Sequence, residues 1–446
     1  MSETFVVVGG DAAGMSAASK AKREDPDLEV VVFERGEWVS YAACGMPYYV
    51  KGAVDELEDL VAVTPEEFRE QREVDLRTGH EVVGVDPGAR TVRVAGPDGA
   101  FDQPYDHLLV ATGASAVEPP FDGMDLDGVF TIHSLDEADA IEEYIAERET
   151  AAVVGGGYVG IEMAEAFAER GLEVHLYEAL PHVLQPFGEP VAEIVENHLR
   201  EQGVELHLET PVSGFVGDSA VEGVDLGTET LPADVAIVGV GVEPNVDLAA
   251  DAGVELGPTG AIAVDEYGRT NREDVYAAGD CAEAGHAVTG EPTHVPLALT
   301  ANRAGRAIGS TVAGTRTPVG ETVGTAIVKA FDLGAARTGL VDEDRAREAG
   351  FDPVSATVSA PTRAHYYPGG SELQVTLLAD TDTGRLLGGS LVGREGVKRV
   401  DTVATALTAG LTVTGLQNAD LAYAPPFSPV WDPVLTAAKV LAGRLA

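Results

Sequence analysis

The chain has little cysteine and little positive charge. Its 446 residues include only two cysteines, and 29 Lys and Arg stand against 74 Asp and Glu, a formal net charge of −45 at pH 7. Two cysteines exclude a disulfide scaffold. The acid excess argues against nucleic acid and anionic membranes as partners, because phosphate contacts need a basic face. We expect a solvated surface adapted to very high salt, where self-repulsion is screened, and infer a halophilic source.

Long apolar runs and a signal-peptide pattern are also missing. No uninterrupted apolar run approaches the ~18 residues of a transmembrane helix, and the first five residues lack a basic segment before an apolar run begins. We therefore expect a cytoplasmic protein with no membrane partner. A hydrophobic content of 45% with 52 glycines predicts two or three loop-rich globular domains of the α/β class.

Residues 5–34 have the pattern of a dinucleotide-binding unit. An apolar run at 5–8 predicts a buried parallel strand, a glycine turn and a small-residue helix from about 15 to 23 follow, and a second strand at 28–33 ends at Glu34. Such a turn places a pyrophosphate on the helix N-terminus, and the acid accepts a ribose hydroxyl. Asp11 replaces the middle glycine of the fingerprint, and we expect its carboxylate to turn away from the phosphates.

A second copy of this pattern lies at 151–178. Gly155, Gly157 and Gly160 match the fingerprint fully, and the following strand ends at Glu178. One such motif is weak evidence, but two embedded in the same strand, helix, strand and acid pattern predict two bound dinucleotides. The short stretches 105–113 and 235–245 each predict a strand entering a tight turn.

The last third of the chain has a different pattern. Residues 275–282 predict a strand that ends at Gly279-Asp280, where an acid can hold a ribityl chain, and Cys281 next to it is interpreted as structural. From about residue 320, strands with hairpin turns, such as 325–329 and 373–377, precede two helices at 398–409 and 433–441. We predict an α+β domain there.

The other cysteine, Cys44, lies in the segment 38–49 among small residues that would let another molecule approach the sulfur. A redox-active pair would place a second cysteine at position 49, which is Tyr49. If Cys44 performs redox chemistry, its partner sulfur must come from a substrate. The alternative is an inert buried cysteine, which is common for a lone thiol.

These segments, in this order, resemble one family over nearly the whole chain. The chain is identified as a member of the FAD-dependent pyridine nucleotide–disulfide oxidoreductases, in their single-cysteine branch of coenzyme A disulfide reductases, NADH oxidases and peroxidases, and persulfide reductases, here from a haloarchaeal source. The resemblance rests on the first glycine turn, 40–49, 111–113, the second glycine turn, Gly279-Asp280, Tyr366-Tyr367-Pro368-Gly369 and Tyr423-Ala424-Pro425-Pro426.

The resemblance implies three domains: an FAD domain at 1–113 and 236–315, an NAD(P)H domain at 114–235, and a dimerisation domain at 320–446 whose residues complete the partner's active site in a homodimer. No metal site is expected. The cofactor-binding residues that it implies are Gly9, Gly10, Ala13, Gly14, Glu34, Arg35, Ala111, Thr112, Gly113, Gly155, Gly157, Tyr158, Val159, Gly160, Glu162, Glu178, Gly241, Gly279, Asp280 and Pro296.

By the same resemblance, catalysis belongs to Cys44 with Tyr366, Tyr367 and Tyr423, since a phenol is a suitable acid for a departing thiolate. Interface packing is the alternative for these tyrosines. The residues implied for coenzyme A are Lys20, Lys22, Arg23, Ser40, Asn302 and Arg306. Ordinary charge at a helix C-terminus is the alternative for the first three of them.

The predicted function is reduction of coenzyme A disulfide through a Cys44–coenzyme A mixed disulfide. A helix N-terminus and the adjacent flavin are expected to lower the pKa of Cys44. The alternatives are an NADH oxidase or peroxidase that cycles Cys44 through sulfenic acid, a persulfide or polysulfide reductase, and a flavin-bound sensor without turnover. Ala12 stands where the peroxidases carry a histidine, which weakens the peroxide alternative. Glu178 favours NADH over NADPH, because it would repel a 2′-phosphate.

Overall fold

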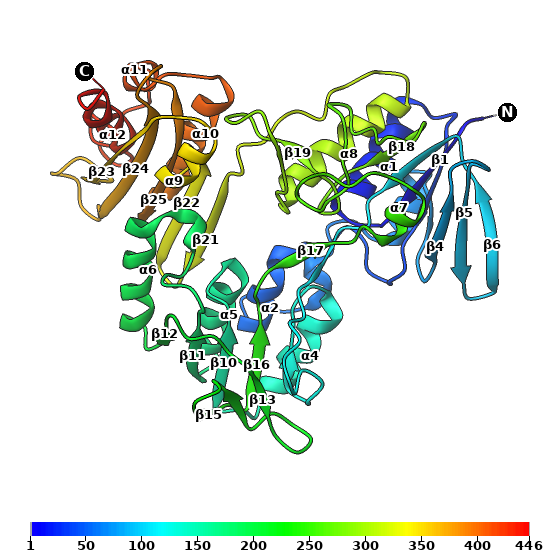
Figure 1. Ribbon diagram of the computed structural model, residues 1–446, viewed down its shortest axis with the longest axis horizontal. Coiled ribbons are helices and arrows are strands. Elements are labelled where there is room, and N and C mark those ends of the chain that lie inside the picture. The colour runs from blue at the N-terminus through cyan, green and yellow to red at the C-terminus, as the bar shows by residue number, and fades with distance from the viewer. Residues whose placement is uncertain (1, 446) are drawn as a thin grey trace.

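The computed structural model describes residues 2–445 and shows three lobes (Figure 1). The first lobe is blue, with its later strand and helix in green, the second is teal to green, and the third runs from yellow to red. Two lobes are built on parallel sheets and the third on an antiparallel sheet. The expected fold of two Rossmann-like domains and a C-terminal α+β domain is therefore confirmed.

The first lobe has a five-stranded parallel sheet in the order β18-β7-β1-β2-β3. Its central strand is fully apolar at Phe5–Val8 and buried on both faces, as a parallel strand between helical layers requires. The elements of this lobe are β1 (Thr4–Val8), α1 (Ala12–Glu24), β2 (Glu29–Phe33), α2 (Met46–Lys51), α3 (Pro65–Gln71), β3 (Asp75–Arg77), β4 (Glu81–Asp86), β5 (Thr91–Gly96), β6 (Gly99–Pro104), β7 (His107–Val110), α7 (Asp247–Asp251), β18 (Val275–Ala277), β19 (Ala284–Gly285), β20 (Pro292–Thr293) and α8 (Ala298–Val312).

Small residues bring α1 and α8 into backbone contact. A Cβ atom on Gly305 would lie 2.1 Å from the carbonyl oxygen of Ala13, and one on Gly309 would lie 2.4 Å from that of Ala17. Such distances leave no room for a side chain, so the two glycines, one helical turn apart, set the helix spacing. This contact fixes the N-terminus of α1 against the first sheet.

The second lobe repeats the architecture with a parallel sheet in the order β12-β11-β10-β16-β9. A small antiparallel sheet, β13-β14-β15, and the pair β8–β17 accompany it. The elements are β8 (Ala114–Ala116), β9 (Val129–Phe130), α4 (Leu135–Ile145), β10 (Thr150–Val154), α5 (Tyr158–Glu169), β11 (Glu173–Tyr177), α6 (Glu189–Glu201), β12 (Glu205–His207), β13 (Gly214–Val216), β14 (Gly223–Asp225), β15 (Thr230–Pro232), β16 (Val235–Val238) and β17 (Val242–Pro244).

One expected domain boundary falls inside a strand. The boundary between residues 235 and 236 lies within β16, which pairs with β10 along Val235–Val238, so the second sheet extends three residues further than expected. The chain then returns to the first lobe through β17, which pairs antiparallel with β8. The two connections between these lobes thus lie side by side.

The third lobe is an antiparallel sheet in the order β21-β22-β25-β24-β23. The helix expected at 398–409 begins with a 3₁₀ turn at Val397–Arg399, and the α-helix follows it. The elements are β21 (Ala326–Ala330), β22 (Leu333–Gly339), α9 (Glu343–Glu348), β23 (Pro353–Pro361), β24 (Glu372–Asp380), β25 (Leu386–Gly393), α10 (Val400–Thr408), α11 (Val413–Gln417) and α12 (Pro433–Ala442).

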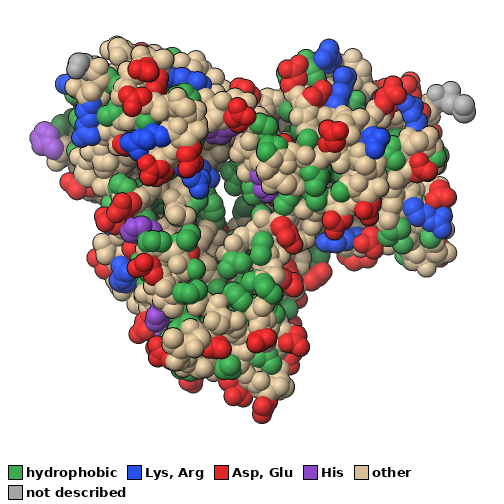
Figure 2. Space-filling model, in the orientation of Figure 1, with side chains coloured by type: hydrophobic (Ala, Val, Ile, Leu, Met, Phe, Trp, Pro, Cys, Tyr) green, Lys and Arg blue, Asp and Glu red, His purple; other side chains and the backbone are tan. Residues whose placement is uncertain are grey.

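Helix α2 follows Cys44 and belongs by sequence to the first domain, yet it packs against the second lobe. Met46 and Val50 share a core with Ile141 of α4 and Phe167 of α5, and Figure 1 shows α2 next to these helices. The cysteine segment is thereby held where the lobes meet. No helix within residues 2–445 combines the length and the apolar character that crossing a bilayer needs. Acidic side chains are scattered over all three lobes on the face shown in Figure 2.

Candidate functional site

The two glycine turns have the shape that a dinucleotide needs. Gly155 has a φ of +103°, and a Cβ on Gly160 would lie 1.8 Å from the carbonyl oxygen of Gly155, so only glycine lets α5 pack this close. A Cβ on Gly157 would meet no atom within 4 Å, which leaves open space where a pyrophosphate approaches the backbone. In the first turn, Gly9 takes the place of Gly155 and has a φ of +109°, and Gly14 takes the place of Gly160 against the preceding turn.

The acid at the end of the second strand is held in the same way in both units. Glu34 accepts a hydrogen bond of 2.7 Å from the N–H of Gly10, and Glu178 accepts one of 2.7 Å from Gly156. Each carboxylate also accepts one of 2.8 Å from the N–H two residues further along the chain. Both acids therefore face their glycine turn, as ribose recognition requires, and this repeated geometry fits two dinucleotides.

Asp11 departs from the fingerprint, and its side chain is turned toward the cysteine segment. Its carboxylate accepts hydrogen bonds from the backbone N–H groups of Ala12 and Tyr41, and burial raises its pKa to about 6. Ser40 next to Tyr41 has a φ of +49° and donates its N–H to the carbonyl of Gly10. The backbone of Ser40 and Tyr41 is therefore hydrogen-bonded to the first glycine turn, and this holds the cysteine segment next to the expected FAD site.

The turn after β7 is locked by Asn245, which the motif analysis did not single out. The Asn245 amide donates to the carbonyl of Thr112 (2.9 Å) and its backbone N–H donates to that of Gly113 (3.0 Å), while Ser115 donates to its side-chain oxygen (2.8 Å). Ala111 precedes this turn, and its carbonyl lies against Gly9. An asparagine shortly after a predicted strand and a glycine is the only sequence signal for this role.

Asp280 lies at the end of β18 beside α1. Gly279 has a φ of +85°, and a Cβ there would lie 3.1 Å from the Cβ of Ala13. Burial raises the pKa of Asp280, whereas His294 and His133 lower it. Pro296 lies in the loop before α8, and the His294 side chain of that loop contacts the carbonyl of Asp280 at 2.7 Å. These groups suit the sugar chain of a flavin dinucleotide.

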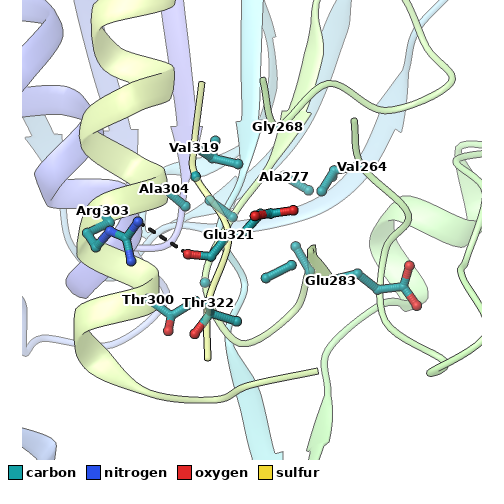
Figure 3. A pocket seen from close by; sticks show the side chains of 15 residues that line it. Val264, Gly268, Ala277, Glu283, Thr300, Arg303, Ala304, Val319, Glu321 and Thr322 are labelled. Atoms are coloured by element: carbon teal, nitrogen blue, oxygen red, sulfur yellow. Dashed lines mark hydrogen bonds between the residues drawn. The ribbon is translucent and has the colours of Figure 1, made fainter. Parts of the chain in front are cut away.

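A cavity lies behind this turn (Figure 3). Its wall combines Gly279 with Thr300 and Arg303 of α8 and the segment 319–322, and Arg303 donates to the carbonyl of Glu321. None of its lining residues belongs to the cysteine segment. We therefore assign this cavity to the packing of α8 against the segment 319–322 and not to the thiol.

Cys44 is exposed, whereas Cys281 is fully buried with its Sγ 3.4 Å from the carbonyl of Ala278. Partial burial raises the pKa of the Cys44 thiol, and the carboxylates of Glu162, Asp280 and Asp11 raise it further. The expected lowering of this pKa is therefore wrong for the protein chain alone. The physical reason is that burial and three carboxylates oppose ionisation of the thiol, whereas α2 begins only at Met46, beyond a 3₁₀ turn.

Glu162 and Tyr158 lie on the first turns of α5. Burial raises the pKa of Glu162 to about 7, and the hydroxyl of Tyr48 donates a hydrogen bond of 3.3 Å to its carboxylate. The Tyr158 hydroxyl accepts a hydrogen bond of 3.1 Å from Arg337 of the third lobe. The structure thus brings together a thiol and a carboxyl group that titrates near neutrality.

We predict that Glu162→Gln lowers the pKa of Cys44 by roughly half to one unit. Above pH 7 the Glu162 carboxylate opposes ionisation of the thiol, so its removal favours the thiolate. The pH profile of iodoacetamide alkylation of the reduced protein measures this shift. Glu169→Gln on the same helix is the control and should leave the profile unchanged. An unaltered profile in Glu162→Gln would contradict the electrostatic contact.

Among the predicted tyrosines, the structure brings two together. The hydroxyls of Tyr366 and Tyr423 are 3.3 Å apart, and this hydrogen bond raises the pKa of Tyr423. Both side chains are exposed on the third lobe, as is that of Tyr367. Within residues 2–445 the side-chain hydrogen bond and ring contacts of these tyrosines involve one another, His365 and Arg363, and none of them involves Cys44.

Five of the six coenzyme A candidates lie along α1 and α8, and the sixth is Ser40. Ser16 donates a hydrogen bond of 2.5 Å to Asn302, and Lys20 forms an ion pair of 2.5 Å with Glu24. Lys22 is not brought to the others, because its ammonium donates to the carbonyls of Pro26 and Leu28 at the end of α1.

The remaining predicted side chains are mostly exposed. Arg23 and Arg306 are exposed on α1 and α8, and Arg35 is exposed just after Glu34. Val159 lies at the start of α5, and Gly241, with a φ of +132°, lies just before β17. Both are near the glycine turn of the second unit.

Comparison with known proteins agrees with this geometry. Residues 3–305 match the profile described as pyridine nucleotide-disulphide oxidoreductase, and residues 325–433 match the dimerisation domain of the same family. The chain therefore belongs to the pyridine nucleotide-disulphide oxidoreductases, the flavoprotein enzymes that use FAD and NAD(P)H. The predicted cofactors FAD and NAD(P)H are confirmed at this level.

Individual relatives differ in their named substrates. The chain is 42% identical to the NAD(P)H sulfur oxidoreductase (CoA-dependent) of Pyrococcus abyssi, over 98% of both chains. It is 31% identical to the coenzyme A disulfide reductase of Staphylococcus haemolyticus, over 95% of this chain and 96% of the relative. The solved NAD-dependent persulfide reductase from A. fulgidus superimposes with a TM-score of 0.96 and 39% identity, over 99% of this chain and 83% of that one.

Proposed function

We propose that this enzyme reduces the sulfur–sulfur bond of a coenzyme A disulfide through the single thiol of Cys44. The observation that carries the proposal is the contrast between its two cysteines: Cys44 is exposed and Cys281 is buried. A protein disulfide between them has no support, so the second sulfur comes from the substrate.

The thiol chemistry follows from the residues around Cys44. The thiolate attacks one sulfur of the substrate, a Cys44–coenzyme A mixed disulfide forms, and the second sulfur leaves as a thiolate that takes a proton. FAD, when bound, supplies the two electrons from NAD(P)H that reopen the mixed disulfide. Glu34, Asp280 and the first glycine turn would hold FAD, and Glu178 with the second turn would hold the nicotinamide dinucleotide.

The proton for the leaving thiolate is assigned to the phenol pair of Tyr366 and Tyr423. Their mutual hydrogen bond and exposed position on the dimerisation domain support donation across a dimer interface, from one subunit to the other's Cys44. Tyr367 stands apart, near the guanidinium of Arg363. In the same proposal, Lys20, Arg23 and Arg306 on α1 and α8 hold phosphates of coenzyme A.

The steady-state oxidation of NADH with different acceptors tests this function. Coenzyme A disulfide should support turnover at least about tenfold faster than oxygen or hydrogen peroxide. Coenzyme A persulfide is the second candidate acceptor, because the 42% identical relative is named a CoA-dependent sulfur oxidoreductase. Turnover with oxygen alone, with no response to either sulfur compound, would instead assign the enzyme to the NADH oxidases.

We predict a preference for NADH over NADPH of about tenfold or more in kcat/KM. Glu178 faces the second glycine turn, where a 2′-phosphate would meet its negative charge. The ratio of the two kcat/KM values at working salt measures this, in the parent and in Glu178→Ala, which should bring the ratio toward one. Glu173→Ala at the start of β11 is the control. A parent that prefers NADPH would remove Glu178 from this role.

We also infer a haloarchaeal enzyme whose dimer depends on salt. With a net charge of −45 per chain, repulsion grows as the Debye length rises from about 3 Å at 1 M to about 30 Å at 0.01 M. Light scattering should show a dimer in molar salt that dissociates at millimolar salt. A dimer that persists at millimolar salt would contradict the inference.

A further inference from the structure

A cluster of metal-binding side chains lies on the second lobe, outside the site described above. Parallel pairing of β11 with the edge strand β12 sets His175 opposite Glu205 and Tyr177 opposite His207. Alternate residues of a strand share one face. His175, Glu205 and His207 therefore lie together on the same face of the sheet, although 32 positions separate the two histidines.

The distances in this cluster are those of a metal site. The Nδ1 atom of His175 lies 3.2 Å from the Nε2 atom of His207 and 3.4 Å from a carboxylate oxygen of Glu205, and one ligand atom from each residue lies within 4.8 Å of the others. A tetrahedral Zn²⁺ with bonds of about 2.0–2.2 Å sets neighbouring ligand atoms roughly 3.3–3.5 Å apart. Two edges of such a tetrahedron are already in place.

The surroundings support ligation. The other ring nitrogen of His175 lies 3.6 Å from a carboxylate oxygen of Glu173, which adds a negative charge beside the cluster. The ring of Tyr177 stacks on that of His207 at 4.6 Å and 10°, which limits rotation of His207. The buried hydroxyl of Tyr177 has no hydrogen-bond partner among the described residues. Buried hydroxyls are normally hydrogen-bonded, so this one suits a further polar group such as an ordered water.

We propose that His175, His207 and Glu205 bind one divalent transition-metal ion, with Zn²⁺ the best match to two imidazoles and one carboxylate, and with a water in the fourth position. The ion would pin the edge strand β12 to β11. The backbone N–H of Glu178 donates to the carbonyl of His207 at 2.9 Å. The metal would therefore fix β12 next to Glu178, the acid expected to bind the ribose of the nicotinamide dinucleotide. This metal site does not depend on which substrate the enzyme reduces.

The test is metal binding by the flavin-loaded protein after treatment with a chelator and transfer to metal-free buffer at high salt. Equilibrium dialysis with Zn²⁺ should give one tight site per chain, and Zn²⁺ should raise the thermal midpoint. Co²⁺ in the same site should show the strong visible bands of tetrahedral coordination. His207→Ala and Glu205→Gln should each weaken Zn²⁺ binding at least about tenfold and abolish the Co²⁺ bands.

His182→Ala is the matched control. His182 pairs with Glu196 at 3.0 Å but belongs to no cluster of three metal-binding side chains within residues 2–445, so its loss should leave the tight site unchanged. Glu205 is exposed, so Glu205→Gln decides the matter even where His207→Ala fails to fold. A parent without stoichiometric Zn²⁺ would overturn the proposal, and so would parental affinity in Glu205→Gln or octahedral Co²⁺ spectra.

Discussion

Cys44→Ser should lower disulfide reduction by at least about a thousandfold, because a hydroxyl cannot replace the thiolate as the attacking group. Reduction of the bound flavin by NADH should continue at nearly the parental rate, since hydride transfer needs no thiol. Stopped-flow absorbance follows flavin reduction, and release of coenzyme A measures the second half-reaction. The two half-reactions should therefore separate cleanly in this variant.

The natural control is Cys281→Ala, which removes the other thiol of the chain. Cys281 is fully buried against the end of β7, with its Sγ 3.6 Å from the carbonyl of Val110. Its loss should cost some stability and leave both half-reactions in place. Equal loss of both half-reactions in Cys44→Ser would show instead that Cys44 is mainly structural.

Local sequence patterns were sufficient for most of the fold. A run of apolar residues followed by a glycine turn and an acid is a local pattern, and it predicted both dinucleotide units, because the turn, the helix and the acid lie within about 30 residues of one another. Cys44, Tyr366 and Tyr423 were selected from their motifs, whereas the exposure of the thiol and the hydrogen bond between the two phenols come from the structure.

Other features depend on contacts between distant segments, which a single sequence does not reveal. The charge around Cys44 comes from Asp11, Glu162 and Asp280, which are far apart in the chain and converge only in the fold. In the chain by itself these acids raise the pKa of the thiol, opposite to the lowering that was expected from the flavin and a helix N-terminus together. Likewise, His175 and His207 meet only because β11 and β12 pair in parallel, so no local spacing indicated a metal site.

Glu165 of α5 links this helix to α2 and to β21. It is buried on α5, and one carboxylate oxygen lies 2.5 Å from the ammonium groups of both Lys51 at the end of α2 and Lys329 on β21. The other oxygen accepts a hydrogen bond of 2.7 Å from the N–H of Phe331. Lysine is scarce in this chain, yet two lysines meet on this one acid.

We predict that Glu165→Gln lowers the free energy of unfolding by about 3 kcal/mol, because it removes the buried carboxylate that Lys51 and Lys329 share and leaves the largely buried Lys51 with the exposed Glu169. Thermal unfolding followed by circular dichroism measures this. Glu169→Gln is the matched control: Glu169 also contacts Lys51, at 3.0 Å, but its side chain is 46% exposed, so its loss should cost less than about 1 kcal/mol. If both variants unfolded at the same temperature, Glu165 would not be the group that holds α2 and β21 against α5.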